Sequence, residues 1–401
     1  MKVIRLREGR ERSLLRRHPW IFDSAVHKGG ADAGETVRVE GHDGRFLAWA
    51  AFSPQSRIRA RAWSFEEGER IDAAFFQRRV RAAVALRARL QVPSEGVRLV
   101  HGESDGLPGF VADRYGNTLV AQFLSTGAER WKKVLADALL EATGLERLYE
   151  RSDANARGLE GLPEATGWLR GDGATEVTIA EHGWRFALDV ATGHKTGFYL
   201  DQRESRARFA DWVRRLGARR VLNCYCYTGG FTVAALAGGA AEVTSIDSSG
   251  PALERARANV ALNGFDAAAC EFLDADVNAM LRRFGEAGRT FDAIVLDPPK
   301  LAPTVAHAER AARAYKDINR LALKLLAPGG LLFTYSCSGG ISADLFHKIV
   351  ASAGADAGVD GYIAERLGAA PDHPMTLAFP EGEYLKGLVV LRKDAGLTTL
   401  P

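Results

Sequence analysis

Cys337 is the residue with the clearest chemical potential in this chain of 401 residues. It lies in the segment Thr334-Tyr335-Ser336-Cys337-Ser338-Gly339-Gly340, at the end of an apolar run that is typical of a strand. A lone cysteine is usually a small buried hydrophobe, but a thiol at a strand end with small neighbours is better suited to act as a nucleophile. The other three cysteines, Cys224, Cys226 and Cys270, lie within or beside strand-like segments, and we expect them to pack in the core.

A second chemical motif, Asp297-Pro298-Pro299-Lys300, follows the apolar segment 291–296. Two prolines cannot extend a strand ladder, so they fix a rigid loop that presents Asp297 and the adjoining backbone. In a parallel sheet, ligands bind outside the carboxyl ends of the strands. We therefore expect this loop to face Cys337 at the mouth of one site.

Three further segments end in residues suited to a nucleoside-like ligand. The first leads into Tyr227-Thr228-Gly229-Gly230-Phe231, where glycines permit a ligand to approach the backbone. This loop lacks the G-x-G-x-x-G pattern of dinucleotide dehydrogenases, which makes hydride transfer the poorer interpretation. The second segment, 242–247, ends in Asp247, whose carboxylate can accept hydrogen bonds from both hydroxyls of a ribose. The third segment, 270–273, is followed by Asp276, which is placed to accept a hydrogen bond from an adenine amino group. Each aspartate can also cap the helix that follows, and capping and ligand binding are not exclusive.

The elements that must position these residues alternate between short apolar strands and amphipathic helices from Arg219 onward. We expect strands at 221–224, 242–247, 270–273, 291–296 and 331–335, with helices between them. This alternation predicts a Rossmann-like α/β domain with a parallel sheet of right-handed βαβ units. A final pair of strands, around 361–366 and 384–392, is expected to add an antiparallel edge and complete seven strands.

The first half of the chain has a different pattern and carries no comparable chemical motif. Residues 1–68 read as short β segments, including 35–39 and 46–52, and predict a small β-barrel. Residues 69–190 predict a central α+β domain with a helix from Ile71 to Leu90, strands near 97–100, 109–112 and 118–123, and a helix over 128–143. We expect this central domain to be a scaffold or a substrate platform, followed by a third domain over 191–401.

Composition narrows the class of protein. The chain is 46% hydrophobic and 26% charged, as in a soluble globular protein. No stretch approaches the roughly 18 apolar residues of a membrane span, and the Arg-rich start lacks the apolar core of a signal peptide. We therefore expect a cytoplasmic protein with no membrane partner. The four cysteines form no CxxC pair and no zinc-like spacing with histidine, so we expect neither a disulfide framework nor a metal.

Positive charge is concentrated at the N-terminus, although the formal net charge is only +3. Within the segment 1–17, Glu8 and Glu11 are the only acidic residues that could balance the basic ones. Further arginines occur at every second position at 57, 59 and 61. Such a distribution is typical of a surface that meets phosphate, and we expect phosphate contacts from Arg10, Arg12, Arg16 and Arg17. A solvated Arg-rich surface is the alternative that charge alone leaves open.

Taken together, these motifs resemble the bacterial class I methyltransferases that make 5-methylcytosine in 23S ribosomal RNA. Beyond the Tyr-Thr-Gly-Gly-Phe, Asp-Pro-Pro-Lys and Ser-Cys-Ser-Gly motifs, the matching segments lie at 9–20, 104–109, 113–116, 193–203, 315–319 and 372–374. The resemblance extends over essentially the whole chain. It implies an N-terminal PUA-like RNA-binding domain, a central α+β domain and a seven-stranded Rossmann-like catalytic domain that uses S-adenosyl-L-methionine.

The resemblance also implies a set of site residues. Gln202, in the segment Gly-Phe-Tyr-Leu-Asp-Gln-Arg, is expected to contact the cofactor, although a polar strand-end role is the alternative. The full set expected to bind the cofactor is Gln202, Asn223, Tyr227, Thr228, Gly229, Asp247, Asp276 and Asp297. Lys300 is expected on the RNA side, at a position where amino-group methyltransferases commonly carry an aromatic residue; its identity argues against N-methylation.

The implied reaction is methylation of a pyrimidine carbon with Cys337 and Asp297 as catalytic residues. C5 of a pyrimidine is too weak a nucleophile to take a methyl group from a sulfonium, but a thiolate adding to C6 makes it enamine-like. Many RNA cytosine-C5 methyltransferases carry a second cysteine in the motif that holds Lys300 here, so the residue that removes the C5 proton stays open. A uracil-C5 methyltransferase and a non-catalytic RNA-binding or ribosome-assembly protein are the alternatives, and the chain is expected to be a monomer or a homodimer.

Overall fold

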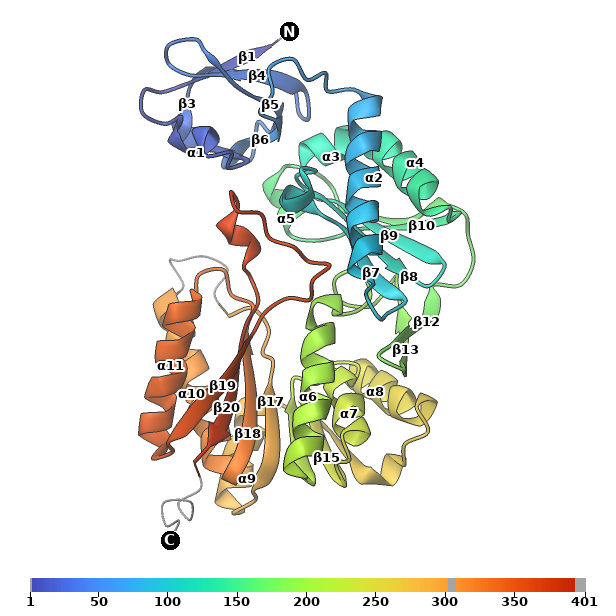
Figure 1. Cartoon of the computed structure of the whole chain (residues 1–401), viewed down its shortest axis with the longest axis vertical. Helices are drawn as coiled ribbons and strands as arrows, with labels where there is room; N and C mark the ends of the chain where they lie inside the picture. Colours follow the sequence, from blue (N-terminus) through green and yellow to red (C-terminus); the bar gives the residue numbers. More distant parts are fainter. Residues whose placement is uncertain (1, 302–307, 394–401) are drawn as a thin grey trace. The chain divides into compact units, whose positions relative to one another are not determined.

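The computed structural model describes residues 2–301 and 308–393 (Figure 1). The chain divides into two compact units. The first unit comprises residues 1–181, 188–200 and 371–382, and the second comprises 182–187, 201–370 and 383–401. Across the described residues, no helix is long and apolar enough to cross a membrane.

The N-terminal part of the first unit is a six-stranded sheet with the order β2-β6-β5-β4-β1-β3. Its core forms because apolar and polar residues alternate along the strands: in β4, Val37 and Val39 are buried between partly exposed neighbours. The short helix α1 (Arg12–Leu15) inserts Leu14 into that core. The strands are β1 (Val3–Leu6), β2 (Trp20–Phe22), β3 (Val26–Gly29), β4 (Thr36–Glu40), β5 (Phe46–Phe52) and β6 (Ile58–Ser64).

The remainder of the first unit is built on a five-stranded sheet with the order β11-β10-β9-β8-β7. Helix α2 (Ala73–Leu90) begins where Asp72 accepts a hydrogen bond from the Phe75 amide, and it packs beside α4. The helix expected over 128–143 is interrupted, because Trp131 leaves helical geometry and its ring packs on Phe76. The elements are α3 (Thr126–Arg130), α4 (Lys132–Thr143), α5 (Ala156–Leu159), β7 (Gly96–His101), β8 (Phe110–Tyr115), β9 (Thr118–Phe123), β10 (Arg147–Ser152) and β11 (Ala165–Arg170). The strands β12 (Glu176–Glu181) and β13 (Trp184–Asp189) form a separate two-stranded sheet.

The second unit is an α/β fold around a seven-stranded sheet with the order β16-β15-β14-β17-β18-β20-β19. Strands β14 to β18 pair in parallel, and β20 is antiparallel to both β18 and β19. The strands are β14 (Arg220–Cys224), β15 (Glu242–Asp247), β16 (Cys270–Asp274), β17 (Phe291–Leu296), β18 (Leu326–Ser336), β19 (Gly361–Leu367) and β20 (Lys386–Arg392). The helices are α6 (Arg203–Leu216), α7 (Gly230–Ala237), α8 (Gly250–Leu262), α9 (Val277–Glu286), α10 (Ala308–Leu325) and α11 (Ala343–Ala357).

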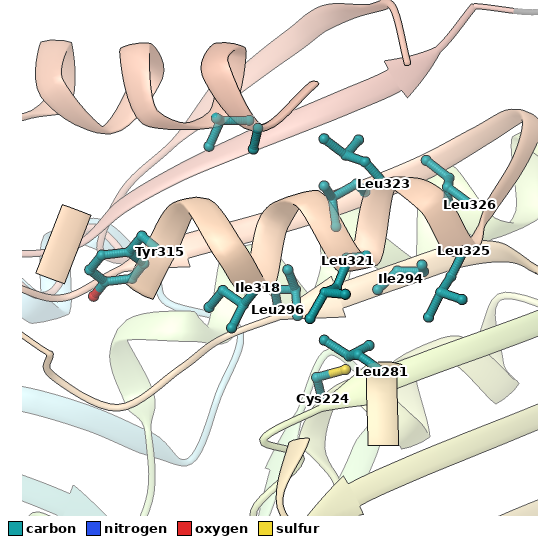
Figure 2. Close-up of a cluster of buried hydrophobic side chains, with 14 of the residues drawn as sticks. Cys224, Leu281, Ile294, Leu296, Tyr315, Ile318, Leu321, Leu323, Leu325 and Leu326 are labelled. Atoms are coloured by element: carbon teal, nitrogen blue, oxygen red, sulfur yellow. The ribbon is translucent and has the colours of Figure 1, made fainter. Parts of the chain in front are cut away.

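One apolar cluster fixes the strand ends that matter for chemistry (Figure 2). Helix α10 buries Tyr315, Ile318 and Ala322, which recur at helical spacing on one face. That face packs over Ile294 and Leu296 of β17. Because the side chains of such a core are close-packed, the carboxyl ends of β17 and β18 are held in a fixed register.

Candidate active site

Asp297 and Cys337 follow neighbouring parallel strands. β17 pairs with β18 so that Leu296 lies opposite Thr334, and both strands leave the sheet at the same edge. The Cys337 sulfur lies 4.0 Å from the carbonyl oxygen of Pro298. The structure therefore brings the Asp-Pro-Pro-Lys loop and the thiol together, as the sequence led us to expect.

Buried hydroxyls hold the backbone on both sides of Cys337. Ser336 and Ser338 are fully buried, whereas Cys337 between them is partly exposed. Ser338 Oγ accepts a hydrogen bond from the Leu301 amide at 3.1 Å and lies 2.9 Å from the Tyr315 hydroxyl. Burial raises the pKa of Tyr315, so this phenol stays protonated and remains able to donate. The thiol is thus carried on a loop anchored to α10 and to the loop after β17.

Lys386 is a residue of this site that the sequence did not single out. It is the first residue of β20, lies opposite Ser336 in the antiparallel ladder and is only 6% exposed. Its ammonium group donates a hydrogen bond to the Ser338 carbonyl oxygen at 2.8 Å. A lysine that begins a strand near the end of the chain gives no sequence signal of burial, because lysine at such a position is normally solvated.

The remaining cysteines are poor candidates for nucleophiles. Cys224 and Cys226 are buried, and burial raises the pKa of both thiols. Cys270 is partly exposed, and desolvation raises its pKa to about 11. Packing is therefore the role of Cys224 and Cys226, while Cys270 is less buried than expected.

Gln202 lies beside Asp297, although the two are far apart in sequence. Its side-chain amide donates to Asp297 Oδ2 at 2.9 Å, and the residue is almost fully buried at the start of α6. Among the residues that the structure describes, no partner reaches the buried oxygens Gln202 Oε1 or Thr228 Oγ1. Buried polar atoms without partners are rare in proteins, so both oxygens fit a site that takes a polar ligand.

The loop after β14 has an unusual backbone. Tyr225, Tyr227 and Gly229 adopt left-handed φ angles of 59°, 46° and 80°. Non-glycine residues in this region cost free energy and are concentrated at functional sites. The Asp247 carboxylate supports the loop, because its Oδ2 accepts from the Tyr227 amide at 2.8 Å and its Oδ1 accepts from the Ser249 amide at 3.0 Å.

Two other expected cofactor residues make hydrogen bonds within the fold. Asn223 is buried in β14, where its side-chain amide donates to Thr232 Oγ1 at 3.0 Å. Asp276 is exposed, and its Oδ1 accepts from the Ala279 amide at 2.8 Å, so it is the N-cap of α9. The helix-capping role that the sequence offered for Asp276 is therefore confirmed, and Asn223 has a structural role that the sequence did not indicate.

The N-terminal arginines differ in their surroundings. Arg10, Arg12 and Arg16 are exposed, and within the described parts of the chain no side-chain hydrogen bond or ion pair engages them. Arg17 is also exposed and pairs with Glu66 at 3.0 Å. The row at 57, 59 and 61 is a basic surface only in part, because Arg57 is exposed whereas Arg61 forms a largely buried pair with Glu160 at 2.7 Å.

Several motif segments of the first unit meet in a buried polar network. Asp105 accepts both arms of the Arg87 guanidinium at 2.6 and 2.8 Å. Asp113 likewise accepts two bonds from Arg98, whose backbone amide donates to Asp372 Oδ2 at 2.9 Å. Buried charges of this kind are tolerated only when paired, so these motif residues have a clear role in holding the first unit together.

Comparison with protein families gives two matches along the chain. A family of S-adenosylmethionine-dependent methyltransferases matches residues 161–385, which include all the strand ends described above. A PUA-like domain family matches residues 4–65, which form the six-stranded sheet.

Individual proteins are similar over almost the whole length. The ribosomal RNA large subunit methyltransferase I of Shewanella amazonensis is 51% identical over 391 residues, covering 96% of this chain and 98% of the relative. The protein of the same name from Aeromonas salmonicida is 50% identical over 392 residues with the same coverage. Among solved structures, a protein from Streptococcus mutans described as a SAM-dependent methyltransferase superimposes with a TM-score of 0.84, 20% identity and coverage of 98% and 100%. A methyltransferase complexed with S-adenosylhomocysteine gives 0.85 at the same identity and coverage, and at this identity both show the fold alone.

Proposed function

The chain belongs to the family of S-adenosylmethionine-dependent methyltransferases with an N-terminal PUA-like domain, and from this premise we propose that it methylates C5 of a cytosine in 23S ribosomal RNA through a covalent bond between Cys337 and C6. The ribosomal substrate is taken from the relatives, which are named ribosomal RNA large subunit methyltransferases. The choice of carbon as the acceptor rests on the thiol at the end of β18. An enzyme that methylates an amino nitrogen needs no covalent nucleophile, whereas carbon methylation of a pyrimidine does.

The single observation that supports this chemistry best is the pairing of Cys337 with the Asp-Pro-Pro-Lys loop. The sulfur is 4.0 Å from the Pro298 carbonyl oxygen, and Asp297 precedes that proline. A base that enters between them has a thiol at one ring carbon and a carboxyl group for its polar edge. The target base must leave its stack to reach this position, as in other enzymes that act on a base.

The cofactor fits the residues at the neighbouring strand ends. Gln202 and Thr228 offer buried oxygens for its polar groups, Asp247 offers carboxylate lone pairs for the ribose, and Gly229 keeps the backbone open. Asn223, Tyr227, Asp276 and Asp297 complete the set that we propose for cofactor binding. When bound, S-adenosylmethionine supplies an electrophilic methyl group for C5 of the base.

The residues of the chain carry the other steps. The Cys337 thiolate forms an S–C6 bond, and the π electrons of C5=C6 move toward C5 and the N3 edge of the ring. Asp297 stabilises that edge as a carboxylic acid, whose O–H donates a hydrogen bond to N3 as negative charge develops there, while its carbonyl oxygen accepts from the exocyclic amine. After methylation, a base removes the C5 proton, the electrons of the C5–H bond restore C5=C6, and the S–C6 bond breaks to return the thiolate.

RNA binding is assigned to the N-terminal part of the chain and to the rim of the catalytic site. Arg10, Arg12, Arg16 and Arg17 carry exposed positive charge, and Lys300 is exposed in the loop that follows the buried Pro298. We assign these residues to the phosphate backbone, which basic side chains bind without reading the sequence. The functional division is a PUA-like RNA-binding domain over 1–68, a central domain over 69–190 and a catalytic domain over 191–401.

The experiment uses large-subunit ribosomal RNA in which the target cytosine is replaced by 5-fluorocytosine. Fluorine cannot leave C5 as a proton, so the thioether cannot be eliminated and we expect a stable protein–RNA adduct on denaturing gels. Cys337→Ala is expected to abolish both the adduct and turnover, while S-adenosylmethionine affinity stays within about twofold, since the thiol acts on the base.

Cys226→Ala is the matched control, because Cys226 also lies just beyond the carboxyl end of a strand of the same sheet, β14, but is buried. It is expected to form the adduct normally. Methyl transfer that persists in Cys337→Ala would refute the covalent mechanism and make N-methylation the better account. Nucleoside analysis of unmodified RNA after reaction distinguishes 5-methylcytosine from 5-methyluridine, and no methylated nucleoside at all would favour a non-catalytic RNA-binding role.

A further inference from the structure

Lys386 is a buried charged residue beside the proposed nucleophile, and the chemistry described so far does not use it. The side chain reaches the site from β20, the strand paired with the carboxyl end of β18. Only 6% of its surface is exposed. A buried ammonium group loses hydration and needs partners that compensate, because isolated buried charges are costly.

One partner of Lys386 is the backbone that carries the thiol. Its ammonium group donates to the Ser338 carbonyl oxygen at 2.8 Å, directly after Cys337. A structural role would be complete with this one bond. An ammonium group has three donor protons, however, and it carries a full positive charge that a carbonyl oxygen does not neutralise.

The ionisable groups around Lys386 interact electrostatically with its ammonium group, and Cys337 is one of them. Burial lowers its pKa, while Cys337, after β18, and Glu383, before β20, raise it again. Lys300, after β17, lowers it further. Electrostatic coupling is reciprocal, so a group that favours the ammonium form of Lys386 is itself favoured in its anionic form by that ammonium. Among the described residues, Tyr315 on α10 and Asp297 after β17 are further ionisable groups near Cys337, and a negative charge on either disfavours a thiolate.

We propose that the ammonium of Lys386 holds Cys337 in the thiolate form, which makes Lys386 a positioning residue for the attack on C6. The thiol proton leaves to solvent, both electrons of the S–H bond stay on sulfur, and Lys386 itself gains and loses nothing. This inference rests on the proposed use of Cys337 as nucleophile and adds the group that activates it. A cationic neighbour is a common way to activate a cysteine, because the thiolate is the reactive form.

The test measures alkylation of the full-length protein by iodoacetamide as a function of pH, with each cysteine followed by peptide mass spectrometry. Lys386→Gln removes the charge but keeps a donor for the Ser338 carbonyl, and Lys386→Met removes both. If the charge is what matters, both variants shift the Cys337 profile to higher pH. At pH 7 we expect alkylation to slow by about tenfold, with rates converging with wild type at high pH. Lys386→Arg, which restores the charge, is expected to recover most of the wild-type rate.

Cys270 provides an internal control in every sample, because it is partly exposed and distant in sequence from β20. Its alkylation should be the same in all variants, and S-adenosylmethionine affinity reports that each variant is folded. A wild-type profile in Lys386→Gln would reduce Lys386 to a hydrogen-bond donor and overturn the inference. A rate that falls equally at every pH would also overturn it, since that is a change in access. The alkylation assay contains no RNA and therefore tests only the effect of Lys386 on Cys337. The proposed function is tested separately, because methyl transfer by Cys337→Ala would refute it whatever the alkylation rates are.

Discussion

At the scale of single residues, Asp247 illustrates how one carboxylate serves both the fold and the site. Its two oxygens accept from the amides of Tyr227 and Ser249, which fixes the left-handed loop after β14 and starts the turn into α8. Each carboxylate oxygen has a second lone pair, so these bonds leave acceptor capacity for ribose hydroxyls. The same atoms can therefore hold the loop and bind the cofactor.

We predict that Asp247→Ala weakens S-adenosylmethionine binding by about 1–3 kcal/mol, because it removes charge-assisted hydrogen bonds to the ribose. Isothermal titration calorimetry of the variant and the wild type measures the change. Asp266→Ala is a suitable control, since the Asp266 carboxylate, like that of Asp247, accepts from the backbone amide two residues later, at 2.9 Å from Ala268, but lies outside the proposed pocket. Equal affinities for wild type and Asp247→Ala would exclude Asp247 from the pocket.

The chemical residues were predictable where strand order and residue type agree. Cys337 and Asp297 come at the ends of apolar segments, so a parallel sheet was enough to bring them to one edge. Lys386 could not be found in this way, because its burial depends on the antiparallel pairing of β20 with β18. The bond between Gln202 and Asp297 likewise depends on how the start of α6 meets the sheet, which sequence spacing does not encode.

At the scale of elements, the loop between β14 and α7 combines strain with close packing. Gly229 has a φ of 80°, and a Cβ placed there would lie 2.9 Å from the Ala256 Cβ on α8. Glycine is required at this position for two reasons: the backbone is left-handed, and the start of α7 approaches α8 too closely to leave room for a Cβ. Any other residue must satisfy both at once.

We predict that Gly229→Ala lowers the free energy of unfolding by roughly 2–4 kcal/mol, since it adds steric overlap to the cost of left-handed geometry. Gly264→Ala separates the two contributions, because Gly264 has a similar φ of 72° but open space around its Cβ position. We expect it to cost only about 1 kcal/mol. Urea denaturation of both variants provides the comparison, and equal reductions in stability would show that packing against Ala256 adds nothing.

Element boundaries were predictable where hydrophobic periodicity is uninterrupted. Strands 242–247 and 291–296 have the bounds that the sequence indicated. The helix expected over 128–143 instead divides at Trp131, whose ring packs 4.6 Å from that of Phe76. Tertiary packing of one aromatic residue overrides the local helix preference here. The break could not be predicted from the sequence around Trp131, because it depends on contact with a residue from another helix.

At the scale of the whole molecule, the distribution of charge carries more information than the net value of +3. The sequence suggested two basic surfaces, one at the N-terminus and one along 57–61. The second is engaged within the fold at one position, because Arg61 pairs with Glu160, 99 residues away in sequence, whereas Arg57 is exposed. Counting charges along the chain cannot separate a buried ion pair from a free cation. In the N-terminal group, Arg10, Arg12 and Arg16 are all exposed.

We predict that reversing two of these charges, in Arg12→Glu/Arg16→Glu, weakens binding to large-subunit ribosomal RNA and reduces its dependence on salt. Each basic side chain that meets a phosphate releases condensed counterions, so the slope of log K against log salt should become shallower by about 0.7–0.9 for every phosphate that is no longer neutralised. Filter binding over roughly 50 to 200 mM salt measures this slope. Arg89→Glu/Arg130→Glu changes the net charge equally at two exposed positions outside residues 1–68, and we expect its slope to match wild type. If the two double variants behave alike, the effect belongs to net charge and the PUA-like domain loses its assigned role; an unchanged slope in Arg12→Glu/Arg16→Glu would place the RNA-binding surface elsewhere on the chain.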